Sequence, residues 1–170
     1  MNLNTTELTG QLVTVLEEQI KVYRTLLEVV RKEKEILVSA NLDELNENNR
    51  SKEAMLLKIR ALETQRMKVA TELSLALNLS AESPRLLEMA KHLELEPGDK
   101  LRNLHSVLEL LLRRVQEYNR QNETLVQNAL SNITGAMNSI RGTLQEKPTY
   151  QKKGEVEGVA SSGQLVSREA

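Results

Sequence analysis

Hydrophobic residues recur three or four positions apart through most of the chain, which is the spacing of one face of an α-helix. The first such stretch, residues 5–39, carries two adjoining apolar rows. One row holds Leu8, Leu12, Val15, Val22, Leu26, Val29 and Ile36, and the other holds Leu16, Ile20, Tyr23, Leu27, Val30 and Leu37. Because the two rows together are wider than a coiled-coil seam, we expect this helix to pack against more than one other helix.

A second helical stretch follows after a short turn, over residues 42–79. Asn41 or Asp43 is placed to accept a hydrogen bond from the free amides of its first turn. A turn this short predicts that the two helices are antiparallel neighbours. The apolar positions of the second stretch are Leu42, Leu45, Asn49, Leu56, Ile59, Leu62, Val69, Leu73 and Leu77.

The next helices are predicted from the prolines. Ser83 followed by Pro84 is typical of an N-cap and a first helical position, which predicts a short helix over residues 85–93. The Glu-Pro-Gly-Asp sequence at residues 96–99 is expected to stop this helix. Asp99 is expected to cap a third long helix over residues 101–144. Its apolar positions are Leu101, Leu104, Leu108, Leu111, Leu112, Val115, Tyr118, Asn122, Leu125, Ala129, Ile133, Met137, Ile140 and Leu144.

Beyond Pro148 the composition changes to glycine, serine and scattered charges without a periodic apolar face. Such a segment cannot bury enough apolar surface to offset its ordering entropy. The predicted organisation is therefore an all-α, elongated antiparallel bundle of three long helices plus a short helix over residues 1–146, with a flexible tail over residues 147–170.

Composition excludes several kinds of function. The 170 residues contain 23 Lys and Arg against 24 Asp and Glu, so no strong positive field is available to attract nucleic acid. The three tyrosines are the only aromatic side chains, which disfavours both base stacking and a ring-lined ligand pocket. No cysteine is present, which excludes cysteine chemistry. No apolar run is long enough to span a membrane, and the first residues do not resemble a signal peptide.

Catalytic or metal-binding chemistry is also not expected. The two histidines, His92 and His105, do not follow a glutamate at the spacing of a di-iron bundle, and we interpret both as exposed helix residues. No glycine-rich phosphate loop, nucleophile elbow or metalloprotease motif occurs. We predict no catalytic residue, no metal site and no cofactor.

With these functions disfavoured, binding to a protein partner is the remaining function to consider. The last part of the third helix has an apolar row but contains many poor helix formers, namely Asn128, Ser131, Asn132, Thr134, Gly135, Asn138, Ser139 and Gly142. Such a segment is stabilised by what it packs on, either its own core or another chain. Asn119 and Asn122 lie where the apolar seam should continue, and they either fix the register of the helices or line a wet site for a partner's backbone.

Three segments resemble one protein family. Residues 52–66 are similar to the "K-x-x-L-L-x-x-L-x-x-L-E-x-x-R" stretch of the FlgN-type flagellar export chaperones, and residues 119–126 resemble that family's "N-x-x-N-x-x-L-L". Residues 148–154 are similar to its "P-T-x-Y-G-x-x-G" ending, with Tyr150 one place nearer the Pro-Thr pair and Gln151 where glycine is usual.

The resemblance implies a cytoplasmic helical chaperone that binds hook-associated proteins of the flagellum, keeps their terminal helical segment from assembling early, and presents them to the export gate. It implies that the client is captured by Asn119, Asn122, Leu125, Val126, Ala129, Leu130, Ile133, Met137 and Ile140. It also implies that Tyr150 contacts the export gate. The alternative from another class is a self-associating coiled-coil scaffold, and the sequence leaves open whether the chain is a monomer or a homodimer.

Overall fold

The computed structural model describes residues 3–80, 82 and 84–145, and all regular structure in these residues is helical. The helices are α1 (Leu3–Ser39), α2 (Leu42–Ala76), α3 (Leu86–His92) and α4 (Leu95–Gln145). This confirms the predicted all-α class with three long helices and a short one. The chain divides into two units, Met1–Val126 and Gln127–Ala170, which we describe separately. The predicted tail over residues 147–170 lies outside the described residues.

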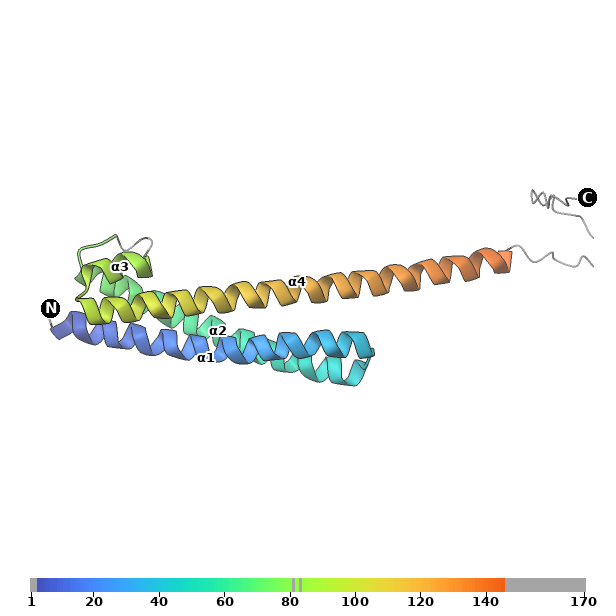
Figure 1. The fold of residues 1–170 in the computed structure, drawn as a ribbon, viewed down its shortest axis with the longest axis horizontal. Coiled ribbons are helices and arrows are strands. Elements are labelled where there is room, and N and C mark those ends of the chain that lie inside the picture. Colours follow the sequence, from blue (N-terminus) through green and yellow to red (C-terminus); the bar gives the residue numbers. More distant parts are fainter. Residues whose placement is uncertain (1–2, 81, 83, 146–170) are drawn as a thin grey trace, which may run out of the picture. The chain divides into compact units, whose positions relative to one another are not determined.

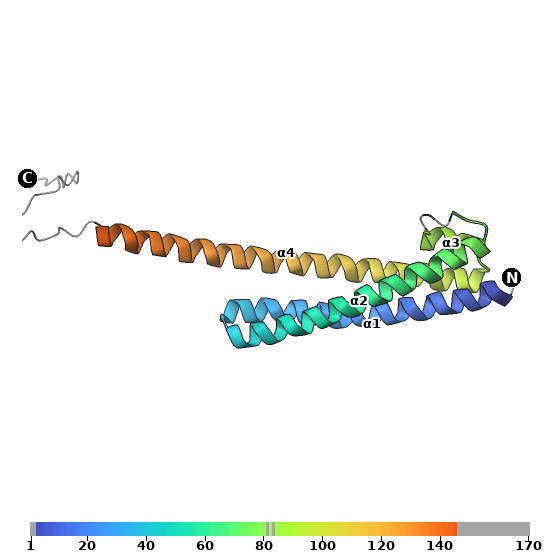
Figure 2. The same cartoon turned by 180° about the vertical axis from the view of Figure 1, so that it is seen from behind.

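Within the first unit, α1 is the helix that both other long helices contact (Figure 1). Helix α2 runs antiparallel to α1, as predicted, and crosses it obliquely on the way from the α1–α2 turn to α3 (Figure 2). The first part of α4 runs parallel to α1. Polar cross-links join the helices of this unit. From α1 to α2 they include Gln19–Glu63 and Glu33–Lys52, and from α1 to α4 they include Glu17–Lys100, Lys34–Gln121, Val30–Asn122 and Glu33–Asn122.

The core consists of two clusters that lie along α1. One joins the first half of α1 to the end of α2, to α3 and to the start of α4, with Leu12, Leu16, Leu73, Met89 and Leu101 fully buried. The other joins the second half of α1 to the middle of α4. The two predicted rows of α1 account for most of this core, because most of the buried apolar side chains of α1 belong to them.

Helix α2 buries less than its pattern predicts. Leu42 and Leu56 belong to the predicted apolar face but are exposed. The polar position was also misplaced by one residue, since Asn49 is exposed and Asn48 is buried. The reason is that α2 diverges from α4, so the middle of α2 has only α1 to pack against.

The two ends of α2 follow known capping chemistry. Of the two predicted candidates, Asn41 is the N-cap, and its Oδ1 atom accepts a hydrogen bond from the Glu44 amide at 3.2 Å. The helix ends at Ala76 rather than at 79, because Asn78 adopts a left-handed conformation with φ of 58°. The amide of Leu79 donates to the Ser74 carbonyl and that of Asn78 to the Leu75 carbonyl, which is the Schellman arrangement.

The prediction that Ser83 caps α3 and that Pro84 begins it was wrong. The N-cap is Arg85, without a capping hydrogen bond from its side chain, and Pro84 lies before the helix. Ser83 lies outside the described residues. Leu86 and Met89 anchor α3 in the first core cluster, so packing sets its position.

The predicted cap at Asp99 was also wrong, because α4 already begins at Leu95. Pro97 is tolerated in the first turn, since the amide it lacks would have no partner within the helix. The first helical bond runs from the Gly98 amide to the Glu94 carbonyl at 3.0 Å. A Cβ on Gly98 would lie 2.5 Å from the Ala90 carbonyl oxygen, so glycine allows α4 to start close against α3.

Candidate functional site

The last third of α4 carries a row of apolar side chains that face solvent. Its members follow one another at steps of four and three residues, which places them on one helical face. Leu130, Ile133, Met137, Ile140 and Leu144 are 57–64% exposed, and Val126 is 41% exposed. We call these six residues the apolar row. Leu144, which the spacing already placed among the apolar positions of this helix, extends the row beyond the residues predicted to capture a client.

The other predicted members of this surface are less exposed or lie beside the row. Leu125 is half-buried, and Ala129 is exposed. Each precedes a member of the row by one residue, and one residue turns the helix by about 100°. Tyr150, the predicted contact to the export gate, lies outside the described residues.

The segment that carries the row is almost uncharged. Between residues 126 and 144, Arg141 is the one ionisable side chain. A Cβ added at Gly135 or at Gly142 would meet no atom within 4 Å, so no contact requires glycine at either place. Each lowers helix stability by about 1 kcal/mol relative to alanine. The segment therefore gains helical stability when a partner covers its apolar face.

Asn122, one of the residues predicted to contact a client, is buried where α4 meets α1. It is 3% exposed and donates from Nδ2 to the Val30 carbonyl at 2.9 Å and to Glu33 Oε2 at 3.0 Å. Lys52 Nζ lies 2.8 Å from the same carboxylate oxygen. Of the two roles left open by the sequence, these contacts favour the fixing of register between α1, α2 and α4.

Asn119 is half-buried, and its Oδ1 atom has no hydrogen-bond partner among the described residues. The Oδ1 atom of Asn122 is orphaned in the same way. Whether either residue contacts a client stays a prediction. An unmatched buried acceptor of this kind costs about 1–3 kcal/mol unless water or another donor reaches it.

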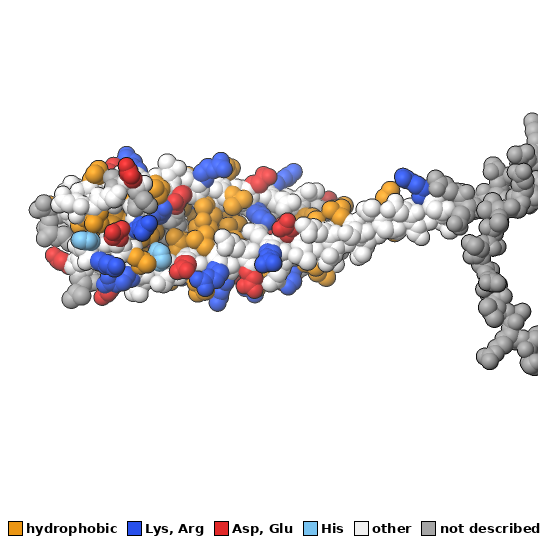
Figure 3. Space-filling view, turned by 90° about the horizontal axis from the view of Figure 1, so that it is seen from above, with side chains coloured by type: hydrophobic (Ala, Val, Ile, Leu, Met, Phe, Trp, Pro, Cys, Tyr) orange, Lys and Arg blue, Asp and Glu red, His pale blue; other side chains and the backbone are white. Residues whose placement is uncertain are grey.

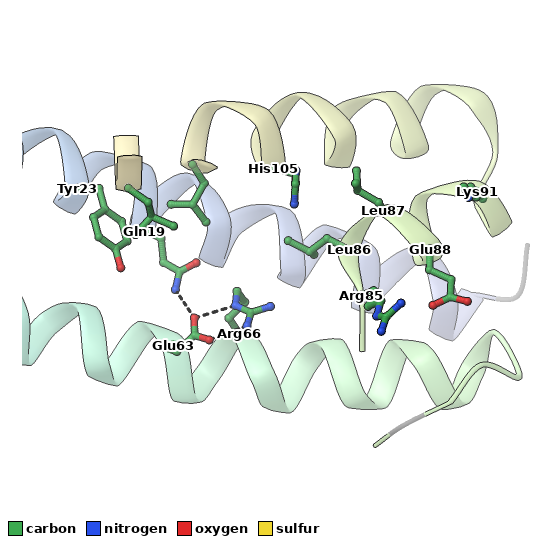
Figure 4. A pocket seen from close by; sticks show the side chains of 12 residues that line it. Gln19, Tyr23, Glu63, Arg66, Arg85, Leu86, Leu87, Glu88, Lys91 and His105 are labelled. Carbon is green, nitrogen blue, oxygen red and sulfur yellow. Dashed lines mark hydrogen bonds and ion pairs between the residues drawn. The ribbon is translucent and has the colours of Figure 1, made fainter. Parts of the chain in front are cut away.

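A second feature, which the sequence did not suggest, is an open pocket of about 740 Å³ between α2 and α4. Helix α1 forms its floor and α3 closes one end (Figure 4). Leu86 and His105 point into it from α3 and α4 (Figure 4). From above, the bundle shows hydrophobic side chains gathered between charged ones (Figure 3). The complete lining is Gln19, Tyr23, Glu63, Arg66, Arg85, Leu86, Leu87, Glu88, Lys91, His105, Leu108 and Leu112.

A hydrogen-bonded trio of polar side chains lies where the α2 side of this pocket meets α1. Glu63 accepts from Arg66 Nε at 2.8 Å and from Gln19 Nε2 at 3.0 Å. The hydrogen bond from Arg66, followed by that from Gln19, holds the pKa of Glu63 below its ordinary value despite partial burial. Burial, with the Glu63 carboxylate adding to it, raises the pKa of Tyr23. The carbonyl oxygen of Gln19 is buried without a donor.

The histidine interpretation was partly wrong. His92 is exposed as predicted, but His105 is half-buried and lines the pocket. In residues 3–80, 82 and 84–145, no group of three or more His, Cys, Asp or Glu side chains could hold a metal ion. None of the helices described is long and apolar enough to cross a membrane.

The missed pocket residues could not be found from periodicity. Gln19 and Arg66 are polar residues on helices whose apolar rows were predicted, and a polar residue inside a helix normally faces solvent. Their burial results from the packing of α2 against α1, where Gln19 and Arg66 both donate to Glu63, and such packing is a tertiary property. The one available signal is that Glu63 and Arg66 are three residues apart and can pair on one helical face.

Comparison with known proteins gives one match. A sequence model of the family described as "FlgN protein" matches residues 1–158. No curated protein and no solved structure matches the chain.

Proposed function

Because this chain belongs to the FlgN family of flagellar export chaperones, we propose that its apolar row captures the terminal helical segment of hook-associated proteins in the cytoplasm. The family is one of chaperones rather than enzymes. The observation that carries the proposal is the exposure of five large apolar side chains of the row by more than half. A contiguous apolar helical face of this kind is a surface for an amphipathic partner helix.

Covering the row would provide affinity for the client and would also stabilise the helical segment that carries the row. Covering one large aliphatic side chain contributes about 1.5–3 kcal/mol before the costs of association. Six such residues, with Leu125 and Ala129 beside them, give enough apolar contact for a client helix. Captured in this way, the client's own apolar face is unavailable for early assembly. The chaperone then delivers the client to the export gate, where Tyr150 of the tail makes contact.

Calorimetric titration with the C-terminal helical segment of a hook-associated protein from the same genome tests this. We expect one segment per chain and a negative heat-capacity change from apolar burial. Ile133→Asp should weaken binding by about 30-fold or more, since it places a charge in the centre of the row. Leu110→Asp is the matched control, because Leu110 is on the same helix, is half exposed, and lies outside the row.

A folded Ile133→Asp variant that binds normally would contradict the capture surface. Deletion of residues 147–170 separates the two roles: it should leave client affinity unchanged and block export. Loss of client binding in that deletion would instead assign the tail to the capture surface.

A further inference from the structure

The pocket between α2 and α4 is followed along α2 by a second cavity, and we call the pocket together with the α2 surface from Glu53 to Arg66 the strip. Along α2, no residue between Asn48 and Val69 is fully buried. A smaller cavity of about 300 Å³, lined by Glu53, Leu56, Leu57 and Arg60, lies on the same helix. Leu56 and Glu63 are seven residues apart and so share a helical face. From Glu53 to Arg66 the strip follows α2 for about 20 Å.

Helix α3 shows that a helix can pack in the space between α2 and α4. It lies across one end of the space between α2 and α4 and buries Leu86, Met89 and Ala90 there. It has only seven residues, so the space beyond its first residue stays open (Figure 4). Leu108 and Leu112 of α4 and Tyr23 of α1 are half-buried in that open part. The strip is thus an incomplete position for a fourth helix.

We propose that this strip binds the apolar row of a second copy of the chain, so that the free protein associates with itself and covers the surface it uses for clients. Three observations favour this occupant. The first is length: the strip offers exposed leucines, Leu56, Leu57 and Leu87, among its charged residues, and its length is comparable to that of the row, since Val126 to Leu144 spans about 27 Å.

Charge is the second observation. The strip mixes acidic and basic side chains, with Glu63 paired to Arg66 and with Glu88 between Arg85 and Lys91 in the sequence. A strongly acidic or basic helix would bring unmatched charge to it. The row segment carries Arg141 alone and therefore brings almost none.

Apolar contact is the third. Leu108 and Leu112 of α4 are half-buried in the open part of the pocket, and the large apolar side chains of the row can pack against them. A row seated in the strip thus matches its length, its charge and its apolar lining.

This inference goes beyond the proposed function, and its test needs no client. Sedimentation equilibrium of the full chain, at about 2–200 μM, should show a monomer–dimer equilibrium. Leu112→Glu or the more exposed Leu87→Glu, in the strip, and Ile133→Asp, in the row, should each raise the dimer dissociation constant at least tenfold. Leu110→Glu, on α4 outside both surfaces, should leave it unchanged.

Mixing the variants tests whether the dimer interface joins the row of one chain to the strip of the other. A Leu112→Glu chain keeps its row and an Ile133→Asp chain keeps its strip, so an equimolar mixture should dimerise although neither variant does alone. A wild-type chain that stays monomeric would overturn the proposal. So would a dimer weakened by Ile133→Asp but not by Leu112→Glu or Leu87→Glu, which would indicate that two rows pair with each other.

Client binding by the same variants separates failure of self-association from failure of client capture. Leu112→Glu should keep full client binding, and by removing a competing association it should raise the apparent client affinity of the chain at high concentration. If Leu112→Glu instead abolishes client binding and the wild type is monomeric, the strip belongs to the client and our proposal is wrong, whereas capture by the chaperone would still stand.

Discussion

The junction formed by Asn122, Glu33 and Lys52 gives a prediction whose size follows from its geometry. Asn122→Asp keeps the shape of the side chain but removes the Nδ2 donor and places a second carboxylate beside Glu33 Oε2, at about the 3.0 Å now spanned by the hydrogen bond. One neutral hydrogen bond and one to a carboxylate are lost, worth about 1 and about 2 kcal/mol.

Repulsion between the carboxylates adds to this loss. Two unit charges about 3 Å apart interact by about 5 kcal/mol at an effective dielectric constant of about 20. Lys52, 2.8 Å from the Glu33 carboxylate, offsets part of that repulsion. Proton uptake by the new carboxyl limits the remainder. We therefore expect the free energy of unfolding to fall by about 3–5 kcal/mol at pH 7.

The loss should depend on pH. The folded state raises the pKa of the introduced carboxyl above its unfolded value of about 3.9. The folded state then binds more protons, so stability falls as pH rises above about 4. Urea unfolding followed by circular dichroism at pH 4.5 and 7 measures this, with Asn103→Asp as the exposed control on the same helix.

A reciprocal substitution makes the test specific. In the double variant Glu33→Gln and Asn122→Asp, the new amide can donate to the new carboxylate, and at least half of the lost stability should return. If Asn122→Asp costs less than about 0.5 kcal/mol at both pH values, or if the double variant shows no recovery, the junction does not hold the three helices in register.

Three further changes test other parts of the fold. Ala40→Gly should raise stability by about 1 kcal/mol, because Ala40 has φ of 55° and glycine adopts this left-handed conformation without strain; an unchanged midpoint of urea unfolding would contradict this. Gly98→Ala should lower stability by about 1–3 kcal/mol through the 2.5 Å approach to the Ala90 carbonyl oxygen, whereas Gly10→Ala, with nothing within 4 Å, should be neutral or stabilising in the same assay. Glu63→Gln should reduce the free energy of unfolding at pH 7, and the loss should shrink as pH falls through the lowered pKa of Glu63. The reason is that a carboxyl with a depressed pKa stabilises the fold only while it is ionised. A pH-independent difference from the wild type would refute the role of its pair with Arg66.

The sequence contained the helices and the exposed row but not the spatial relations that make the pocket. The predicted rows of α1 proved to be its core, because a helix contacted from two sides must carry a wide apolar stripe. The apolar row of α4 was recognised from its spacing, but the sequence left open whether it packs in the chain's own core or on another chain, and the structure shows it exposed. The prediction of Leu56 as a core residue failed, since spacing indicates which side chains share a face and not whether another helix covers that face.

Helix starts were predictable only where a side chain makes the cap. Asn41 caps α2 with its own carboxamide, which confirms one of the two predicted candidates. Arg85 begins α3 without such a bond, and α4 begins before Pro97 because its first turn packs on α3. At these two starts tertiary contact outweighs the local signal, and a rule based on Pro and Asp therefore misplaced both.

The central position of α1 has a consequence for local opening of the native chain. Both core clusters lie on α1, so its amides should exchange with solvent deuterium only when the bundle opens as a whole. The described end of α4 has no buried side chain from residue 126 onward, and its amides can exchange by fraying alone. A pulse of deuterium would therefore label the end of α4 that carries the apolar row first, and protection that appears there would record the arrival of whatever covers it.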